Sequence, residues 1–225
     1  MNTNVSEASP IRLRPLLVLV SAAAKVWLTG CQTAGYKKSD AAALNSQSAA
    51  RCVQTESQEL EATIGALNEL VNQPATNAEP QFLKFDQALD RLVASAGSAE
   101  SEVNGIRSKG AAYFAVWDKE IPAIQDPVTR SVSKAREADV RSQFDATLRA
   151  CDETRTNVQP LIVYLQDIRK ALSTDLTRNG LFAIKSSVVS ANDRASLAQS
   201  ALAQSAAELD TLSARTASFR VQEVK

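Results

Sequence analysis

Cysteine is the residue in this sequence with the clearest capacity for chemistry, since a thiol can be acylated, oxidised or bound to a metal. The chain has 3 cysteines, Cys31, Cys52 and Cys151. The last two fall in helical stretches, and at a rise of about 1.5 Å per residue both lie roughly 30 to 36 Å from one end of the same bundle. A disulfide would form if their helices are neighbours, because the Cα atoms must come within about 7 Å. If the helices are diagonal, the two cysteines are small core residues, which is the interpretation we favour.

Other catalytic or metal-binding patterns are missing from the sequence. Histidine is absent and no Cys-x-x-Cys pair occurs, and the carboxylates are scattered among basic residues. Serine is abundant, but it has no histidine base and no Gly-x-Ser-x-Gly turn. Lys plus Arg and Asp plus Glu are each 25, so no net positive charge attracts nucleic acid. We therefore expect no enzyme, no cofactor, no metal site and no nucleic-acid partner.

Residues 1–30 have the composition of a secretory signal peptide. Arg12 and Arg14 supply the positive charge, and the apolar run over 16–28 follows them, interrupted by Lys25. The run is shorter than the roughly 20 apolar residues that a membrane-spanning helix needs. We expect this segment to direct export and to be removed.

Leu28, Thr29, Gly30 and Cys31 resemble the lipobox of bacterial lipoproteins. In that family the cysteine thiol receives a diacylglyceryl group, and cleavage leaves the cysteine as an acylated N-terminus. The resemblance implies that Cys31 carries palmitate-type lipid and anchors the chain to a membrane. It also implies the outer membrane, facing the periplasm, because Gln32 stands where an aspartate favours retention in the inner membrane. The inner membrane is the second choice.

The stretch from residue 82 to residue 117 has the clearest helical pattern. Apolar or small residues recur there at alternating steps of three and four, which drives left-handed packing of the coiled-coil type. Small residues fill the middle of this seam, so we expect neighbouring helices to approach closely. Tyr113, Phe114 and Trp117 near its end fit the packed end of a bundle better than an exposed contact patch. The seam consists of Phe82, Phe85, Leu89, Leu92, Ala96, Ala99, Val103, Ile106, Gly110, Tyr113 and Trp117.

Three further helices are predicted over 40–73, 127–175 and 181–219. In the first, Val53, Leu60, Ile64, Leu67 and Val71 lie on one face. The third begins with a proline at the favoured first position and contains a second proline at residue 160, where we expect a bend without a break. The fourth repeats the alternating seam, again with small residues in its centre, so we expect it to pack well against the second.

The turns between these helices are short. We place them at residues 73–80, at 118–126, and at Asn179 and Gly180 or nearby residues. Short connections between long helices favour antiparallel neighbours. The fold we predict is all-α: an elongated antiparallel bundle of about four long helices with coiled-coil-like packing, preceded by the signal peptide. Residues 31–39 would be the lipidated N-terminus and tether, and residues 40–222 a single bundle domain.

The chain as a whole resembles a proteobacterial lipoprotein family known only as domain of unknown function 2959. The resemblance rests on the lipobox, on Gly35-Tyr36-Lys37-Lys38 just after it, and on the aromatic segment Ala-Ala-Tyr-Phe-Ala-Val-Trp at residues 111–117. This family implies no activity. The Gly-x-x-x-x-Gly-Lys-Ser/Thr phosphate loop of ATPases is absent from the sequence.

These features predict a membrane-anchored envelope lipoprotein with a non-enzymatic role, either structural or in protein interaction. The protein would attach to a membrane through lipid on Cys31, and it would bind a protein partner in the envelope. A leftover apolar stripe could also pair two copies of the chain. The alternative is a periplasmic binding module that holds a lipid or small ligand between its helices, although the alanine-rich centre argues against a roomy cavity.

Overall fold

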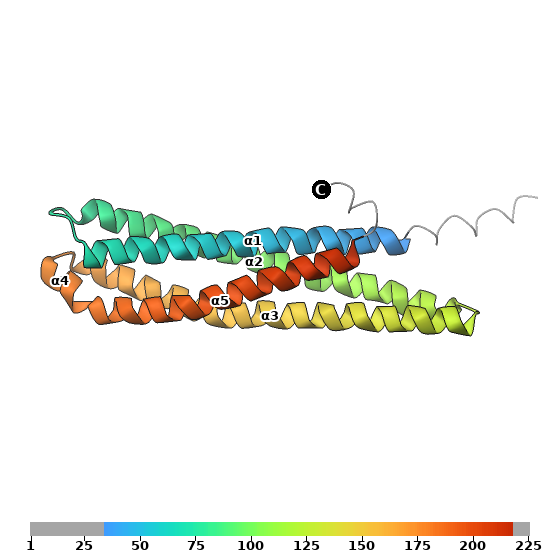
Figure 1. Ribbon diagram of the computed structural model, residues 1–225. Coiled ribbons are helices and arrows are strands. Elements are labelled where there is room, and N and C mark those ends of the chain that lie inside the picture. Colours follow the sequence, from blue (N-terminus) through green and yellow to red (C-terminus); the bar gives the residue numbers. More distant parts are fainter. Residues whose placement is uncertain (1–33, 218–225) are drawn as a thin grey trace, which may run out of the picture. The chain divides into compact units, whose positions relative to one another are not determined.

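Four long helices make up most of residues 34–217, which are the residues described by the computed structural model (Figure 1). No strand occurs among these residues, so the predicted all-α fold is confirmed. A short 3-10 turn, η1, follows α2, and a short helix, α4, precedes α5. The elements are α1 (Ala34–Asn72), α2 (Glu79–Glu120), η1 (Ile121–Ala123), α3 (Pro127–Thr174), α4 (Arg178–Ala183) and α5 (Lys185–Thr216).

The long helices surround one core in a closed ring of neighbours. Helix α1 packs against α2 and α5, and α3 packs against the same two helices. This places α1 and α3 at opposite corners, and likewise α2 and α5. Cross-helix contacts such as the one between Asn68 and Asn192 and the one between Ser39 and Thr216 show that α1 and α5 run antiparallel. The arrangement is the predicted up-down-up-down bundle.

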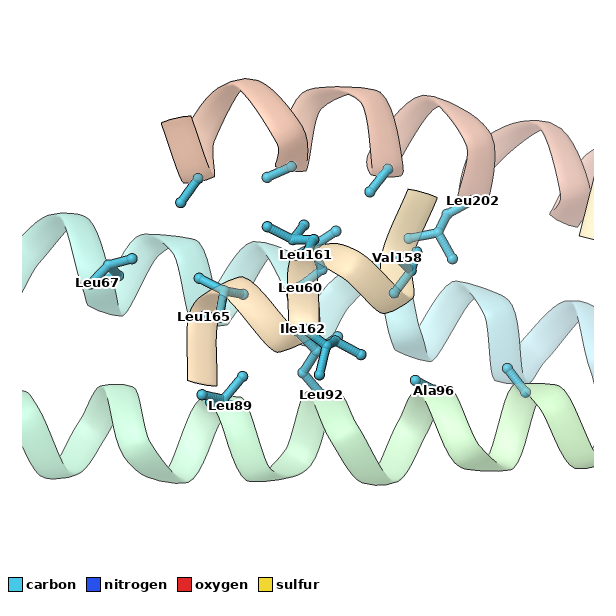
Figure 2. Close-up of a cluster of buried hydrophobic side chains, with 14 of the residues drawn as sticks. Leu60, Leu67, Leu89, Leu92, Ala96, Val158, Leu161, Ile162, Leu165 and Leu202 are labelled. Atoms are coloured by element: carbon cyan, nitrogen blue, oxygen red, sulfur yellow. The ribbon is translucent and has the colours of Figure 1, made fainter. Parts of the chain in front are cut away.

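The alternating seam of α2 faces this core as predicted. Phe85, Leu89 and Leu92 are fully buried, and Phe82 and Val103 are partly buried against the same cluster. Figure 2 shows labelled side chains from α1, α2, α3 and α5 gathered between the helices. Burial of large aliphatic side chains contributes about 1.5–3 kcal/mol each, which is the main stabilising contribution in such a bundle. The labelled side chains are Leu60, Leu67, Leu89, Leu92, Ala96, Val158, Leu161, Ile162, Leu165 and Leu202.

The beginning of α3 matches the sequence prediction, and the helix continues through its internal proline. Asp126 caps the helix, since its carboxylate accepts a hydrogen bond from the Thr129 amide at 2.6 Å. Pro160 is exposed. Proline has no backbone N–H, so the helical hydrogen bond that is lost here lies on the solvent side of the helix. Helix α3 therefore has no break at this position.

The turn after α3 lies a few residues before the Asn179 and Gly180 pair near which it was predicted. It lies at residues 175–177, and Asn179 and Gly180 belong to α4 instead. The Thr177 hydroxyl caps α4 by accepting from the Gly180 amide at 3.2 Å. A side chain at Gly180 would collide with the backbone oxygen of Asp175, 2.2 Å away, so glycine is needed for this close approach. The predicted fourth helix is divided at Ile184, because α4 turns to bury Leu181 against the core.

The predicted tether over residues 31–39 is helical from Ala34 onward. Helix α1 begins at Ala34, and its first turns contact other helices. The Lys38 ammonium donates to the Ala112 carbonyl oxygen at 3.5 Å, and the Ser39 hydroxyl donates to the Thr216 carbonyl oxygen. The first helix was predicted to begin at residue 40. These contacts explain why it begins earlier, within the polar segment that was predicted as a tether.

Several predictions concern residues outside the described part of the chain. These are the signal peptide over 1–30, Cys31 itself and the end of the bundle near residue 222. Among the described helices, none combines the length and the apolarity that a membrane crossing requires.

Candidate functional site

A carboxylate lies in the centre of the bundle, on the buried face of α1. Glu56 is only 5% exposed. It follows Val53 by three residues and precedes Leu60 by four, so helical periodicity places all three side chains on the core-facing stripe. The sequence thus puts an ionisable group where the pattern calls for an apolar one.

Glu56 makes no hydrogen bond and no ion pair with any other described residue. Glutamate is almost never buried without a partner, because an unpaired charge loses its hydration. Burial alone raises the pKa of the Glu56 carboxyl to about 7. The group therefore exchanges its proton near neutral pH instead of remaining ionised.

A cavity of about 140 Å³ lies beside Glu56, lined by side chains from all four long helices. Its apolar wall includes Val53 of α1 and Val158 of α3. Ala96, Ala99 and Val103 form the α2 side, and Ser205 is the lining residue from α5. The volume is close to that of an engineered apolar cavity that holds benzene, about 150 Å³.

Two ion pairs between α2 and α3 stand at the rim of this cavity. Arg107 pairs with Asp152, and Arg155 pairs with Glu100 at 3.3 Å. All four side chains are at least 39% exposed, so these pairs face solvent and each contributes little to stability. Because each guanidinium already has a carboxylate partner, the buried Glu56 is the lining carboxylate without one.

Two hydroxyl groups of the cavity are held by structural hydrogen bonds. The Thr154 hydroxyl donates to the carbonyl oxygens of Ala150 and Ala201, at 3.0 and 2.9 Å. The Ser205 hydroxyl donates to the Leu202 carbonyl oxygen at 3.2 Å. Both oxygens keep lone pairs that can accept a further hydrogen bond. The site therefore offers hydroxyl acceptors and the carboxyl of Glu56, together with the side-chain amides of Asn104 and Gln159, which also line it.

The two cysteines of the bundle are free thiols, and the disulfide that the sequence allowed is not formed. Their helices, α1 and α3, are the diagonal pair of the ring. Burial raises the pKa of the Cys151 thiol to about 11, and burial followed by the Glu102 charge raises that of Cys52. Cys151 lines the cavity as a neutral thiol, as expected of a small core residue.

The small residues in the middle of α2 and α5 have a different role from the predicted one. These helices are diagonal, so their alanine-rich centres do not pack together as neighbours. Ala96 and Ala99 instead border the cavity, because short side chains leave the space across the core unfilled. The centre thus contains a cavity, but one of only about 140 Å³, which agrees with the expectation that an alanine-rich centre leaves no roomy one.

The sequence prediction missed Glu56, although the pattern contained a signal for it. The apolar residues proposed for the first helix leave a gap of seven between Val53 and Leu60. Glu56 occupies the missing position in that gap. A charged residue at a position where the helical pattern calls for an apolar one marks a candidate functional residue, and it can be recognised from the sequence.

The described side chains bring together no group of His, Cys, Asp and Glu that could hold a metal ion. Comparison with known proteins gives a family match and no relative of known activity. The sequence matches the family described as a protein of unknown function (DUF2959) over residues 27–214. No curated protein matches the chain.

Proposed function

The chain belongs to the DUF2959 family of proteins of unknown function, and from its own residues we propose that it is a bacterial envelope lipoprotein anchored through lipid on Cys31. The observation that supports this most is the position at which the bundle begins. Helix α1 starts at Ala34, so only Gln32 and Thr33 separate it from the lipobox cysteine. The family match covers residues 27–214, a range that contains residues 28–31, which resemble a lipobox.

The short spacing has a mechanical consequence for the proposal. Three residues of extended chain span about 10 Å, so an acylated Cys31 would hold the first turn of α1 close to the membrane surface. Several acyl chains on one cysteine anchor a protein stably, whereas one chain binds only marginally. The proposed location is the outer membrane facing the periplasm, in line with Gln32 after the cysteine.

The proposed role of the bundle is non-enzymatic binding of another envelope protein. Two observations support it. The hydroxyls of the cavity are held by backbone carbonyls, and the Cys151 thiol is kept protonated by burial, so the polar groups there are poor nucleophiles. The first turns of α3 present Val128 and Val132, which are 69% and 65% exposed, as apolar surface outside the core.

A second candidate function is binding of a small ligand between the helices. The observation that favours it is the 140 Å³ cavity beside the buried carboxyl of Glu56. A cavity of this size accommodates a molecule of about benzene size, which is far smaller than a lipid.

Palmitate labelling tests the anchor. Cells that express the wild-type chain, Cys31→Ala or Cys52→Ala would be grown with radiolabelled palmitate and then fractionated. We expect label on wild type and on Cys52→Ala, and none on Cys31→Ala, which should leave the membrane fraction. Separation of the two membranes on a density gradient should place the labelled protein in the outer one. Absence of label from all three chains, or label on Cys31→Ala, would show the proposed anchor to be wrong.

A further inference from the structure

We propose that the cavity between α1, α2, α3 and α5 binds a small organic cation, an alkylammonium of about five non-hydrogen atoms, whose charged nitrogen pairs with the Glu56 carboxylate. This inference deepens the second candidate function and rests on it. The anchor on Cys31 has no part in it.

The charges around the cavity determine the sign of the ligand. The α2 side has Glu100 and Arg107, and the α3 side has Asp152 and Arg155. These four groups form the two rim ion pairs and cancel one another. Ionised Glu56 then leaves the cavity with one uncompensated negative charge, which a cation would neutralise.

No other described side chain around Glu56 supplies the positive charge that would pair with its carboxylate. Cys52, one turn away on α1, and Cys151 on α3 both have thiol pKa values raised by burial, so both stay neutral. Helix α5 contributes Ser205, which has no charge. The buried carboxylate thus lacks a counter-ion from every helix that packs around it.

The size and polarity of the cavity determine the rest of the ligand. Val53, Ala99 and Val158 offer apolar contacts for a short alkyl chain. The oxygens of Thr154 and Ser205 retain lone pairs, so they can accept from ammonium hydrogens that Glu56 does not use. An ammonium group has three donors and no acceptor, so it can pair with the Glu56 carboxylate and with hydroxyl or amide oxygens of the lining, which includes Asn104 and Gln159.

Access to the cavity is compatible with reversible binding. The rim side chains are partly exposed, and exposed ion pairs are worth only about 0–1 kcal/mol each. Rotation of a long arginine side chain can therefore open the space between α2 and α3 at small cost.

The test is an NMR titration of the purified full-length chain with n-butylammonium and with n-butanol, its neutral counterpart of equal length. We expect saturable binding of n-butylammonium at pH 8.5, with shifts in residues around Glu56, and at least about tenfold weaker binding of n-butanol. Because only ionised Glu56 pairs with the cation, affinity should fall about thirtyfold at pH 5.5.

Three variants separate the contributions to binding. Glu56→Gln keeps the shape and removes the charge, so it should weaken n-butylammonium at least about tenfold. Ala99→Leu fills the cavity and should abolish binding of any probe while circular dichroism shows an intact helical fold. Glu61→Gln, an exposed position on the same helix, should bind as wild type does.

Two other outcomes would contradict the inference, the first in the charge of the ligand and the second in ligand binding altogether. If n-butanol binds as tightly as n-butylammonium and Glu56→Gln binds both, the bundle holds small ligands but the cation assignment is wrong. If neither probe binds saturably to wild type at either pH, both the cation assignment and the ligand-binding function are wrong.

Discussion

Glu56 shows how one residue can set the pH response of a whole bundle. Its carboxyl is buried without a partner, and burial raises its pKa to about 7 from an ordinary value of 4.5. Between these two values the folded chain binds more protons than the unfolded chain does. Stability therefore falls as the pH rises through this range, and the loss is complete above the folded-state pKa.

Replacement of Glu56 by glutamine should remove this pH dependence. At about 1.4 kcal/mol per pKa unit, Glu56→Gln should be about 3 kcal/mol more stable than wild type at pH 8.5 and about equally stable at pH 4.5. Urea unfolding at both pH values measures the difference. The exposed Glu61→Gln is the matched control and should show no such gain. A Glu56→Gln variant that is less stable than wild type at pH 8.5 would mean that the ionised carboxylate has a stabilising partner.

At the scale of elements, the approach of α2 to α3 depends on a glycine. A Cβ at Gly110 would lie 2.2 Å from two atoms of the Phe144 ring. That ring cannot easily retreat, because it already packs edge-on against Phe114 with centroids 5.3 Å apart. The expectation that small residues let helices approach closely is thus met at this end of α2, whereas alanines in the middle border a cavity.

Two glycine substitutions on the same helix should have opposite effects. Gly110→Ala should destabilise the protein by about 1–3 kcal/mol, because it forces the Phe144 ring out of its packing. Gly97→Ala has open space around its Cβ, so the better helix propensity of alanine should stabilise by about 0.5–1 kcal/mol. Thermal and urea unfolding of both variants provide the comparison. Equal stabilisation by the two would contradict the close packing of Phe144 on α2.

At the scale of the whole bundle, stability should be unevenly distributed. Helix α1 begins at the level of Val116, and α5 ends at the level of Arg136, which donates to the Arg215 carbonyl oxygen at 2.7 Å. Beyond these levels α2, η1 and the start of α3 pack only with one another. Of the described residues between 117 and 136, only Ile121 is buried, and the nearest apolar cluster, formed by Tyr113, Phe114 and Val140, lies at the border of this end.

Hydrogen exchange should reveal this division. Amides over residues 118–132 should exchange earlier than those over 85–99 and 158–168, because fewer buried apolar contacts hold the two-helix end closed. Mass spectrometry of the full-length chain after timed exposure to heavy water measures the difference. Equal protection in all three segments would indicate that the end is as firmly packed as the centre.

The sequence alone determined the elements of this protein, because helical periodicity is a local property. The seam from Phe82 to Trp117, the start of α3 at Pro127 and the all-α bundle could all be predicted, and so could the family. The sequence pattern misplaced two helix boundaries, because contacts between distant parts of the chain determine where these helices begin and end. Residues 34–39 became helical because they reach α2 and α5, and the turn moved to residues 175–177 because Gly180 packs against Asp175.

Only the tertiary structure decided what the middle of the bundle contains. Spacing put Ala99 and Cys151 on buried faces, but it did not say which helices are neighbours and which are diagonal. The diagonal placement kept the two thiols apart, and it left Ala96 and Ala99 of α2 bordering a cavity instead of packing against the alanines of α5. The pKa of Glu56 and the charge balance around it depend on that arrangement, since desolvation and pairing arise only when all four long helices are in place.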